Sequence, residues 1–276
     1  MSDAMLRIGW FATARGTGSY NLLEATTRAI REGRLRASIA FVFCNREPGE
    51  AEPTDRFFDL VRANGIPLVT LSSVRFRRER DGERSRPDEP LPQWRWHYDH
   101  EVARLIAPYP FDVGMLAGYM LIVTSELTDR HPLLNLHPAA PGGPAGIWQD
   151  VIRQLIVARE KRSGVTIFRV TPEVDAGPPV AYCTYPIDDG ELTPLWRKAV
   201  DVPPEKLEDT ALFRAIRERG AARELPMVVA TLRAFAEGER RFEGGRAVDA
   251  AGREAALDLT AEVEAAVAAM RGAASA

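Results

Sequence analysis

Two polar side chains lie two positions apart where an apolar run meets a turn. The run Leu-Leu-Asn-Leu-His at residues 133–137 is followed by a loop rich in Pro and Gly. Because side chains alternate along a strand, Asn135 and His137 share one face of it and the leucines face the other way. An amide and an imidazole can both donate hydrogen bonds, and an imidazole can also move a proton near neutral pH. α/β proteins bind ligands at such strand ends, which makes the pair a candidate for a binding site. The alternative for an isolated Asn-x-His is a strand end whose two polar side chains form hydrogen bonds within the protein and have no further role.

A second motif adds a carboxylate to this pair. Residues 174–178 read Val-Asp-Ala-Gly-Pro. Together the two stretches resemble the folate-dependent formyltransferases, and most closely the glycinamide ribonucleotide formyltransferases of purine synthesis. That family carries Asn-x-His-Pro and a later Asp-x-Gly-Pro. The resemblance implies Asn135, His137 and Asp175 as the catalytic residues and 10-formyltetrahydrofolate as the co-substrate.

Formyl transfer to an amine passes through a tetrahedral intermediate that bears an oxyanion, so it needs a donor to that oxygen and a route for the amine proton. Protonated His137 and the amide of Asn135 can supply the oxyanion contact. Asp175 can hold the imidazole and raise its pKa, or relay the proton through water. This chemistry requires no metal and no covalent nucleophile.

The first residues of the chain predict the opening unit of a nucleotide-binding α/β protein. An apolar run at 5–12 leads into a glycine-bearing loop and then into a helical pattern at 20–32. Backbone amides of the loop and of the helix start would form a phosphate seat. The family has a Gly-x-Gly-Ser-Asn phosphate loop here, whereas Tyr20 separates Ser19 from Asn21, which leaves the Asn21 contact open. The phosphate-binding residues implied are Gly16, Thr17, Gly18, Ser19 and Asn21.

Strands that alternate with helices predict an α/β fold. Apolar runs at 38–44, 66–71, 111–119 and 165–170 favour a mostly parallel, Rossmann-like sheet flanked by helices, as in the formyltransferase fold. Residues 180–187 alternate in polarity, which predicts an antiparallel strand at the edge of the sheet. One formyltransferase α/β domain is expected over residues 1–190.

The folate side is implied by the run at residues 111–119, which resembles a family segment whose following backbone binds the pterin. Leu121 stands where the family has an arginine, so one carboxylate contact is missing. Arg95 falls where the family has an arginine near the glutamate tail of the folate. The resemblance assigns as folate-binding residues Arg95, Met120, Leu121, Val123, Thr171 and Val174.

Two regions depart from the family pattern. Residues 72–93 look like an arginine-rich insertion, either a solvated loop or a lid whose arginines meet an anionic substrate or a neighbouring subunit.

On the acceptor side, Ala221 replaces a family glutamate that touches the ribose, although Glu224 lies nearby. Ser163 replaces a family histidine. A different amine as the acceptor is therefore the alternative to glycinamide ribonucleotide.

Residues 191–276 predict a C-terminal helical extension, with helices at 208–219, 225–237 and 247–270. We expect the last helix to pack on the α/β domain. The alternatives are a frayed end and pairing with a second copy of the chain, which would make a homodimer.

Composition narrows the function classes. The 276 residues contain 45% hydrophobic and 27% charged residues, and the formal net charge of −3 gives no global attraction to nucleic acid or membranes. Cys44 and Cys183 lie in apolar runs, lack metal-ligand spacing and read as reduced core residues. With no long apolar segment, a cytoplasmic location is expected.

The sequence leaves three hypotheses for the function. The first is a formyltransferase that acts on glycinamide ribonucleotide, a phosphorylated amine. The second is the same reaction on another small amine, such as a sugar nucleotide. The third is a folate- or nucleotide-binding homologue without turnover. A dinucleotide dehydrogenase is disfavoured because Asn21 stands where the third glycine of Gly-x-Gly-x-x-Gly would be.

Overall fold

The computed structural model describes residues 5–86, 89–173, 176–199 and 201–274. The first half contains β1 (Leu6–Ala12), α1 (Thr17–Arg31), β2 (Ala37–Cys44), α2 (Glu52–Ala63), β3 (Leu68–Thr70), α3 (Ser73–Arg78), α4 (Trp94–Ile106), β4 (Val113–Leu116), α5 (Ser125–Thr128) and β5 (Leu133–His137). The second half contains α6 (Trp148–Val157), β6 (Arg162–Arg169), β7 (Pro179–Pro186), α7 (Thr193–Ala199), the 3-10 helix η1 (Pro204–Asp209), α8 (Ala211–Ala236), β8 (Arg240–Glu243), β9 (Arg246–Asp249), β10 (Leu257–Asp258) and α9 (Thr260–Ala274).

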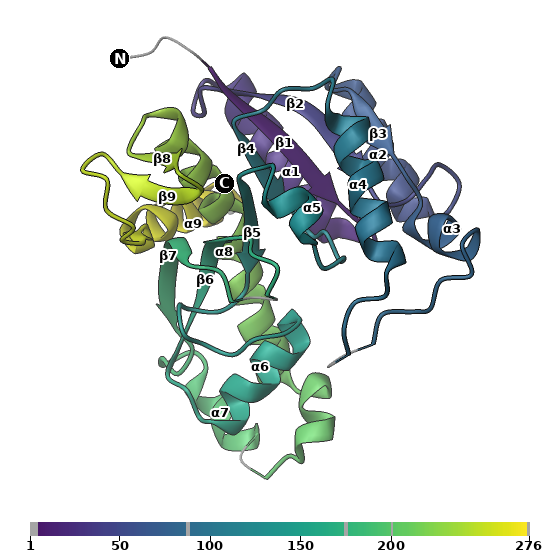
Figure 1. Ribbon diagram of the computed structural model, residues 1–276. Helices are drawn as coiled ribbons and strands as arrows, with labels where there is room; N and C mark the ends of the chain where they lie inside the picture. Colours follow the sequence, from purple (N-terminus) through teal and green to yellow (C-terminus); the bar gives the residue numbers. More distant parts are fainter. Residues whose placement is uncertain (1–4, 87–88, 174–175, 200, 275–276) are drawn as a thin grey trace.

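One sheet of eight strands organises these elements, in the order β10-β7-β6-β5-β4-β1-β2-β3 (Figure 1). The strands from β3 to β5 are parallel, and β6 and β7 each run antiparallel to the strand before them. The predicted mostly parallel, Rossmann-like sheet is confirmed. Because β1, β4 and β5 are parallel, the turn after Ala12 and the side chain of His137 come at the same edge of the sheet.

Alternation along β1 separates the two layers of the core. Ile8 and Trp10 pack on one face of the sheet with residues of α1 and α8. Phe11 points to the opposite face, into an aromatic cluster with Phe43 and with Tyr98 of α4. In Figure 1, α4 and α5 lie in front of the sheet while α1 lies behind it. Helices on both faces explain why the strands read as near-continuous apolar runs.

The predicted edge strand is antiparallel, as expected, but it does not lie at the edge. β10 pairs in parallel with β7, with Leu257 opposite Ala181, and Leu259 donates its amide to Tyr182 at 2.8 Å. A strand of two residues is too short for a period-2 pattern to reveal, so the sequence reading missed it. The C-terminal segment therefore contributes to the main sheet.

The expected helices at 208–219 and 225–237 are one continuous helix, α8, with Pro226 inside it. Proline removes one helical hydrogen bond and usually marks a boundary, which is why the sequence suggested two helices. Buried side chains on both sides of the proline, Arg223 and Met227, pack this helix onto the domain.

The expected helix at 247–270 is wrong in its first part. β8 and β9 form a hairpin, in which the glycines at 244 and 245 both adopt positive φ angles of 55° and 77°. Two consecutive left-handed residues are what a tight hairpin turn requires, and glycine adopts them without steric cost. Only α9, from Thr260, matches the predicted final helix.

The first part of the arginine-rich segment is a helix, α3, rather than loop. Ser72 caps it by accepting the amide hydrogen of Arg75 at 3.2 Å, and Phe76 is buried against Tyr98 with ring centroids 5.1 Å apart. Further along, the Trp94 Nε1 group donates to the carbonyl oxygen of Glu83 at 2.8 Å. No helix in the described part of the chain is long and apolar enough to cross a membrane.

Candidate active site

Asn135 and His137 lie two positions apart on β5, and both are half-buried. Asn135 pairs with Phe168 of β6, and the ring of His137 lies 6.2 Å from the ring of Phe168. The Nε2 atom of His137 is 2.9 Å from the carbonyl oxygen of Pro144. A strand and an aromatic ring thus fix the two predicted donors on one face, at the carboxyl end of β5.

The loop after His137 is held by β6. The hydroxyl group of Thr166 donates to the carbonyl oxygen of Ala139 at 2.7 Å. A Cβ atom at Gly164 would lie 2.8 Å from the Cα atom of Ala140, so only glycine lets the loop approach this closely. These contacts turn the chain back so that Pro144 reaches the imidazole.

Asp175 and Val174, predicted as a catalytic and a folate-binding residue, lie outside the described residues. The loop that carries them leaves β6 at Val170, whose amide donates to the carbonyl oxygen of Leu133 at 2.8 Å. It returns at Gly177, where a Cβ atom would lie 1.7 Å from the carbonyl oxygen of Arg169. The glycine of the Asp-x-Gly-Pro motif is therefore a steric requirement, and both ends of the loop lie against the neighbouring strands β5 and β6.

Thr171, another predicted folate-binding residue, begins this loop. Its hydroxyl group donates to the carbonyl oxygen of Glu173 at 3.2 Å, and its side chain is half-buried. This local bond shapes the start of the loop. Contact between Thr171 and a folate stays a prediction.

The predicted phosphate seat is the start of α1. Gly16 is the N-cap residue, and the helix begins at Thr17, earlier than expected. Nothing lies within 4 Å of the positions that Cβ atoms of Gly16 and Gly18 would occupy, so the helix start is open at these two glycines. Unpaired amides at a helix start favour an anion at this place. Asn21 lies one turn further along the helix and is exposed.

The folate-binding residues predicted after β4, Met120, Leu121 and Val123, lie in an irregular segment, residues 118–124, which we call the folate wall. Met120 is 57% exposed and Ile122 38%, whereas Val123 is buried. Leu121 is half-buried. An exposed apolar backbone segment beside a polar strand end is a suitable surface for a flat heteroaromatic ring. The sequence reading missed Ile122, although the apolar run that contains it is visible in the sequence.

Three polar residues hold the folate wall, and sequence reasoning assigned none of them this role. Thr13 accepts the amide hydrogen of Met120 at 2.8 Å, and Asp99 accepts that of Thr124 at 2.7 Å. Arg95, predicted near the folate tail, is 1% exposed and donates to the carbonyl oxygen of Ile122 at 2.5 Å. Burial raises the pKa of Asp99, and the charge of Arg95 opposes that rise. Thr13 carries no sequence signal beyond its place directly after a strand.

The two residues considered for the acceptor side, Ala221 and Glu224, both lie in α8. Glu224, which lies near the position of the missing family glutamate, forms an ion pair with Arg217, and its side chain is 13% exposed. The guanidinium of Arg217 in turn lies over the ring of Trp148, 4.8 Å from its centre. Glu224 is therefore already engaged within the protein.

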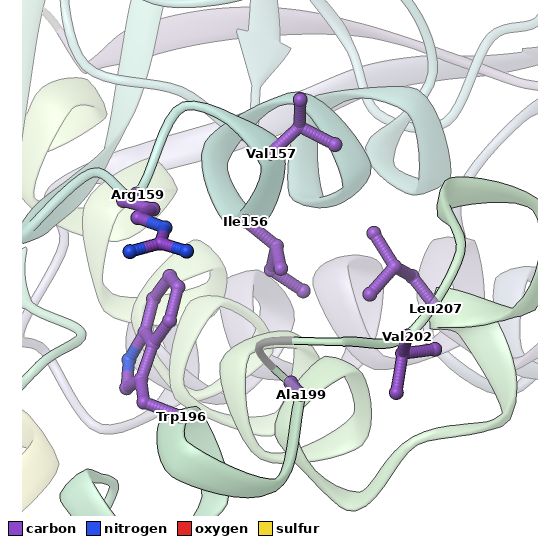
Figure 2. Close-up of a pocket in the computed structure, with 7 residues that line it drawn as sticks. All are labelled: Ile156, Val157, Arg159, Trp196, Ala199, Val202 and Leu207. Carbon is purple, nitrogen blue, oxygen red and sulfur yellow. The ribbon is translucent and has the colours of Figure 1, made fainter.

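A cavity of about 190 Å³ lies elsewhere, between α6, α7 and the segment that leads into η1 (Figure 2). Figure 2 shows the apolar side chains of Ile156, Val202 and Leu207 around it, with Arg159 and Trp196 on one side. None of the predicted site residues lines it. No residue of β5, of the loop after it or of the first turn of α1 lines it, so this cavity is separate from the candidate active site. Among the described residues, no group of three His, Cys, Asp or Glu side chains could hold a metal ion.

Comparison with known proteins bears on this geometry. Residues 13–200 match the family model described as formyl transferase. The phosphoribosylglycinamide formyltransferase of Dictyostelium discoideum is 29% identical over 173 residues, which cover 58% of this chain and 76% of that protein.

Solved structures give the same picture. Glycinamide ribonucleotide transformylase 1 from Symbiobacterium toebii superimposes with a TM-score of 0.62 and 26% identity, covering 90% of this chain and 95% of that one. A formyltetrahydrofolate deformylase from Pseudomonas syringae gives a TM-score of 0.60 at 19% identity, covering 90% of this chain and 66% of that one. At this lower identity the likeness shows a shared fold alone.

Proposed function

Because the chain belongs to the formyl transferase family, we propose that it transfers the formyl group of 10-formyltetrahydrofolate to a phosphorylated amine, with glycinamide ribonucleotide as the best candidate. The observation that carries the proposal is the placement of Asn135 and His137. They share one face at the carboxyl end of β5, and only β4 separates that strand from β1 and its glycine-bearing turn. The relatives named for glycinamide ribonucleotide support this acceptor.

In this reaction the amine nitrogen attacks the formyl carbon and the carbonyl oxygen becomes an oxyanion. The Asn135 amide and the protonated imidazole of His137 would donate hydrogen bonds to that oxygen. The new carbon–nitrogen bond forms as the amine loses a proton, and the bond to the folate nitrogen breaks as that nitrogen gains one. Asp175 would hold the imidazole and pass the proton, directly or through water.

The donor side has suitable chemistry for the folate. Met120 and Ile122 present exposed apolar side chains, which match the face of a pterin ring. We propose that Leu121, Val123, Thr171 and Val174 complete this side of the pocket. The acceptor phosphate would lie against the first turn of α1, at Gly16, Thr17, Gly18 and Ser19, with Asn21 one turn further.

One contact of the family pattern, that of a carboxylate with the ribose of the acceptor, has no equivalent at positions 221 and 224. With Ala221 in place of the family glutamate and Glu224 paired with Arg217, no carboxylate at these two positions is free to bind a ribose hydroxyl. We therefore expect weaker ribose recognition than the family pattern provides. The phosphate seat and the catalytic pair remain, so the amine and the phosphate should dominate acceptor binding.

The test is a comparison of formyl loss from 10-formyltetrahydrofolate with and without glycinamide ribonucleotide. We expect loss that depends on the acceptor and saturates with its concentration. Loss at the same rate without any amine would indicate that water is the acceptor, which contradicts the proposal. If other phosphorylated amines support a higher kcat/KM than glycinamide ribonucleotide, formyl transfer stands and the named acceptor is wrong.

A further inference from the structure

The folate wall lacks the backbone ladder that holds ordinary strands. Within the described stretch 118–124 no residue belongs to a helix or strand, so its amides and carbonyls depend on other partners. One end is fixed by Asp99 and Arg95 of α4, as described above. At the other end, Tyr119 packs against Phe11 and Phe43, and the backbone is held by Thr13, which directly follows β1.

Thr13 makes two bonds to this end of the folate wall. Its amide donates to the carbonyl oxygen of Gly118 at 3.0 Å, and its Oγ1 atom accepts the amide hydrogen of Met120 at 2.8 Å. The residue is 4% exposed, so water does not compete strongly for these bonds. Met120, whose amide is held, is also the most exposed apolar side chain of the folate wall.

The same end of the folate wall touches the phosphate seat. Gly118 has a φ angle of 71°, in the left-handed region that favours glycine. A Cβ atom at Gly118 would lie 2.5 Å from the Oγ atom of Ser19. Ser19 belongs to the first turn of α1 and is itself buried. The two predicted half-sites are therefore in direct contact at Gly118, the residue whose carbonyl oxygen Thr13 holds, and Thr13 lies three residues before Gly16, where the phosphate seat begins.

We propose that Thr13 is a positioning residue that fixes the folate wall relative to the phosphate seat, and so sets the distance between the formyl carbon and the acceptor amine. This inference rests on the proposed function, because it assumes that the two surfaces bind the two substrates. Thr13 touches neither substrate. It acts through the backbone amide of Met120.

Loss of the hydroxyl group has a definite consequence for the donor. Without it, the amide of Met120 has no acceptor in its place, and a buried donor without a partner is unfavourable. The folate wall would then shift toward another partner or toward water. Donor binding should suffer first, and turnover should fall because the reacting atoms no longer meet at bonding distance. The phosphate seat keeps its own amides, so acceptor binding should change little.

The experiment compares Thr13→Val, Thr13→Ser and Thr26→Val with wild type. Valine keeps the shape of threonine without the hydroxyl group, and serine restores that group. Thr26 is the matched control, because it is fully buried and its hydroxyl group donates to the carbonyl oxygen of Leu22 within α1. We measure KM for 10-formyltetrahydrofolate, KM for glycinamide ribonucleotide and kcat. We also measure hydrogen exchange of the Met120 amide without ligands.

In Thr13→Val we expect the donor KM to rise by about tenfold, kcat to fall and the acceptor KM to stay within about twofold. Exchange at Met120 should become faster. Thr13→Ser should restore all of these, and Thr26→Val should change none. An unchanged donor KM in an active Thr13→Val enzyme overturns the inference, and so does an equal loss for Thr26→Val. A wild type that binds no folic acid in equilibrium dialysis and transfers no formyl group refutes the proposed function, and the role of Thr13 with it.

Discussion

The guanidinium of Arg95 donates a hydrogen bond of 2.5 Å to the carbonyl oxygen of Ile122, from a side chain that is only 1% exposed. The family resemblance implies an arginine near the glutamate tail of the folate at this position. In the structure the buried Arg95 instead binds the backbone of the folate wall, and its guanidinium lies 3.5 Å from the buried carboxylate of Asp99. We propose that Arg95 supports the folate site through the backbone of the folate wall.

Replacing Arg95 by Leu should destabilise the protein strongly, because the carboxylate of Asp99 would remain buried without its cation. Removal of one partner of a buried ion pair costs about 3–5 kcal/mol. The matched control is Arg56→Leu, which breaks the exposed pair of the same helical spacing with Glu52. Urea denaturation should show a large loss of unfolding free energy in the first variant and almost none in the second. Equal effects would contradict a structural role for the buried pair.

The contact between Gly118 and Ser19 predicts a compensating pair of substitutions. Gly118→Ala places a Cβ atom 2.5 Å from the Ser19 hydroxyl oxygen and should lower both stability and turnover. Adding Ser19→Ala removes that oxygen, so the double variant should be more stable than Gly118→Ala alone. It should remain below wild type, because alanine in the left-handed region costs roughly 1 kcal/mol. Thermal unfolding measures both steps, and a double variant no more stable than Gly118→Ala would show that the two residues are not in contact.

The parallel sheet, the strand that carries Asn135 and His137 and the glycine-bearing turn could all be predicted from the sequence. Each shows a local pattern of apolar runs, alternating polarity or closely spaced glycines. The continuous α8 was missed because burial on both sides of Pro226 outweighed a local helix-breaking signal. β10 was missed because pairing with β7, rather than its own two residues, makes it a strand. The roles of Thr13 and Asp99 arise from contacts between residues far apart in the chain, 107 positions for Thr13 and Met120. A single sequence gives no sign of such contacts.

Cys44 and Cys183 should be inert in the native protein. Both are buried, and burial raises the pKa of each thiol from an ordinary value of 9.0 to about 12. At pH 8 a thiol reagent should therefore label neither cysteine until the protein is unfolded, when both react. Rapid labelling of the native protein would contradict their burial.

The same shifts predict a loss of stability in alkali. Between about pH 9 and 12 the thiols ionise in the unfolded chain but stay protonated in the folded one. The unfolded state then binds fewer protons, so the unfolding free energy should fall as the pH rises through this window. Urea titrations at pH 8 and 10 measure this, and a Cys44→Ala, Cys183→Ala double variant should show a smaller decline.

The arginines of α3 offer a test of the lid hypothesis. α3 directly follows β3 at one end of the sheet order, whereas α8, which carries Ala221 and Glu224 of the predicted acceptor side, packs on β6 and β7. Arg77 donates to the carbonyl oxygen of Gly82 at 3.1 Å and so holds its own turn. We expect Arg77→Ala with Arg78→Ala to leave the acceptor KM unchanged in steady-state assays. A clear rise in the acceptor KM would instead support the hypothesis that these arginines form a lid over the acceptor.

We propose above all that Asn135 and His137 catalyse direct transfer of the formyl group from the folate to an amine by stabilising the oxyanion. The most direct measurement follows label from formyl-labelled 10-formyltetrahydrofolate into glycinamide ribonucleotide, in wild type and in the Asn135→Ala, His137→Ala and Asp175→Asn variants. We predict labelled product from wild type and a loss of roughly a hundredfold or more in kcat for His137→Ala, with circular dichroism unchanged. Absence of label in the acceptor with wild type, or turnover by folded His137→Ala at the wild-type rate, would contradict the account.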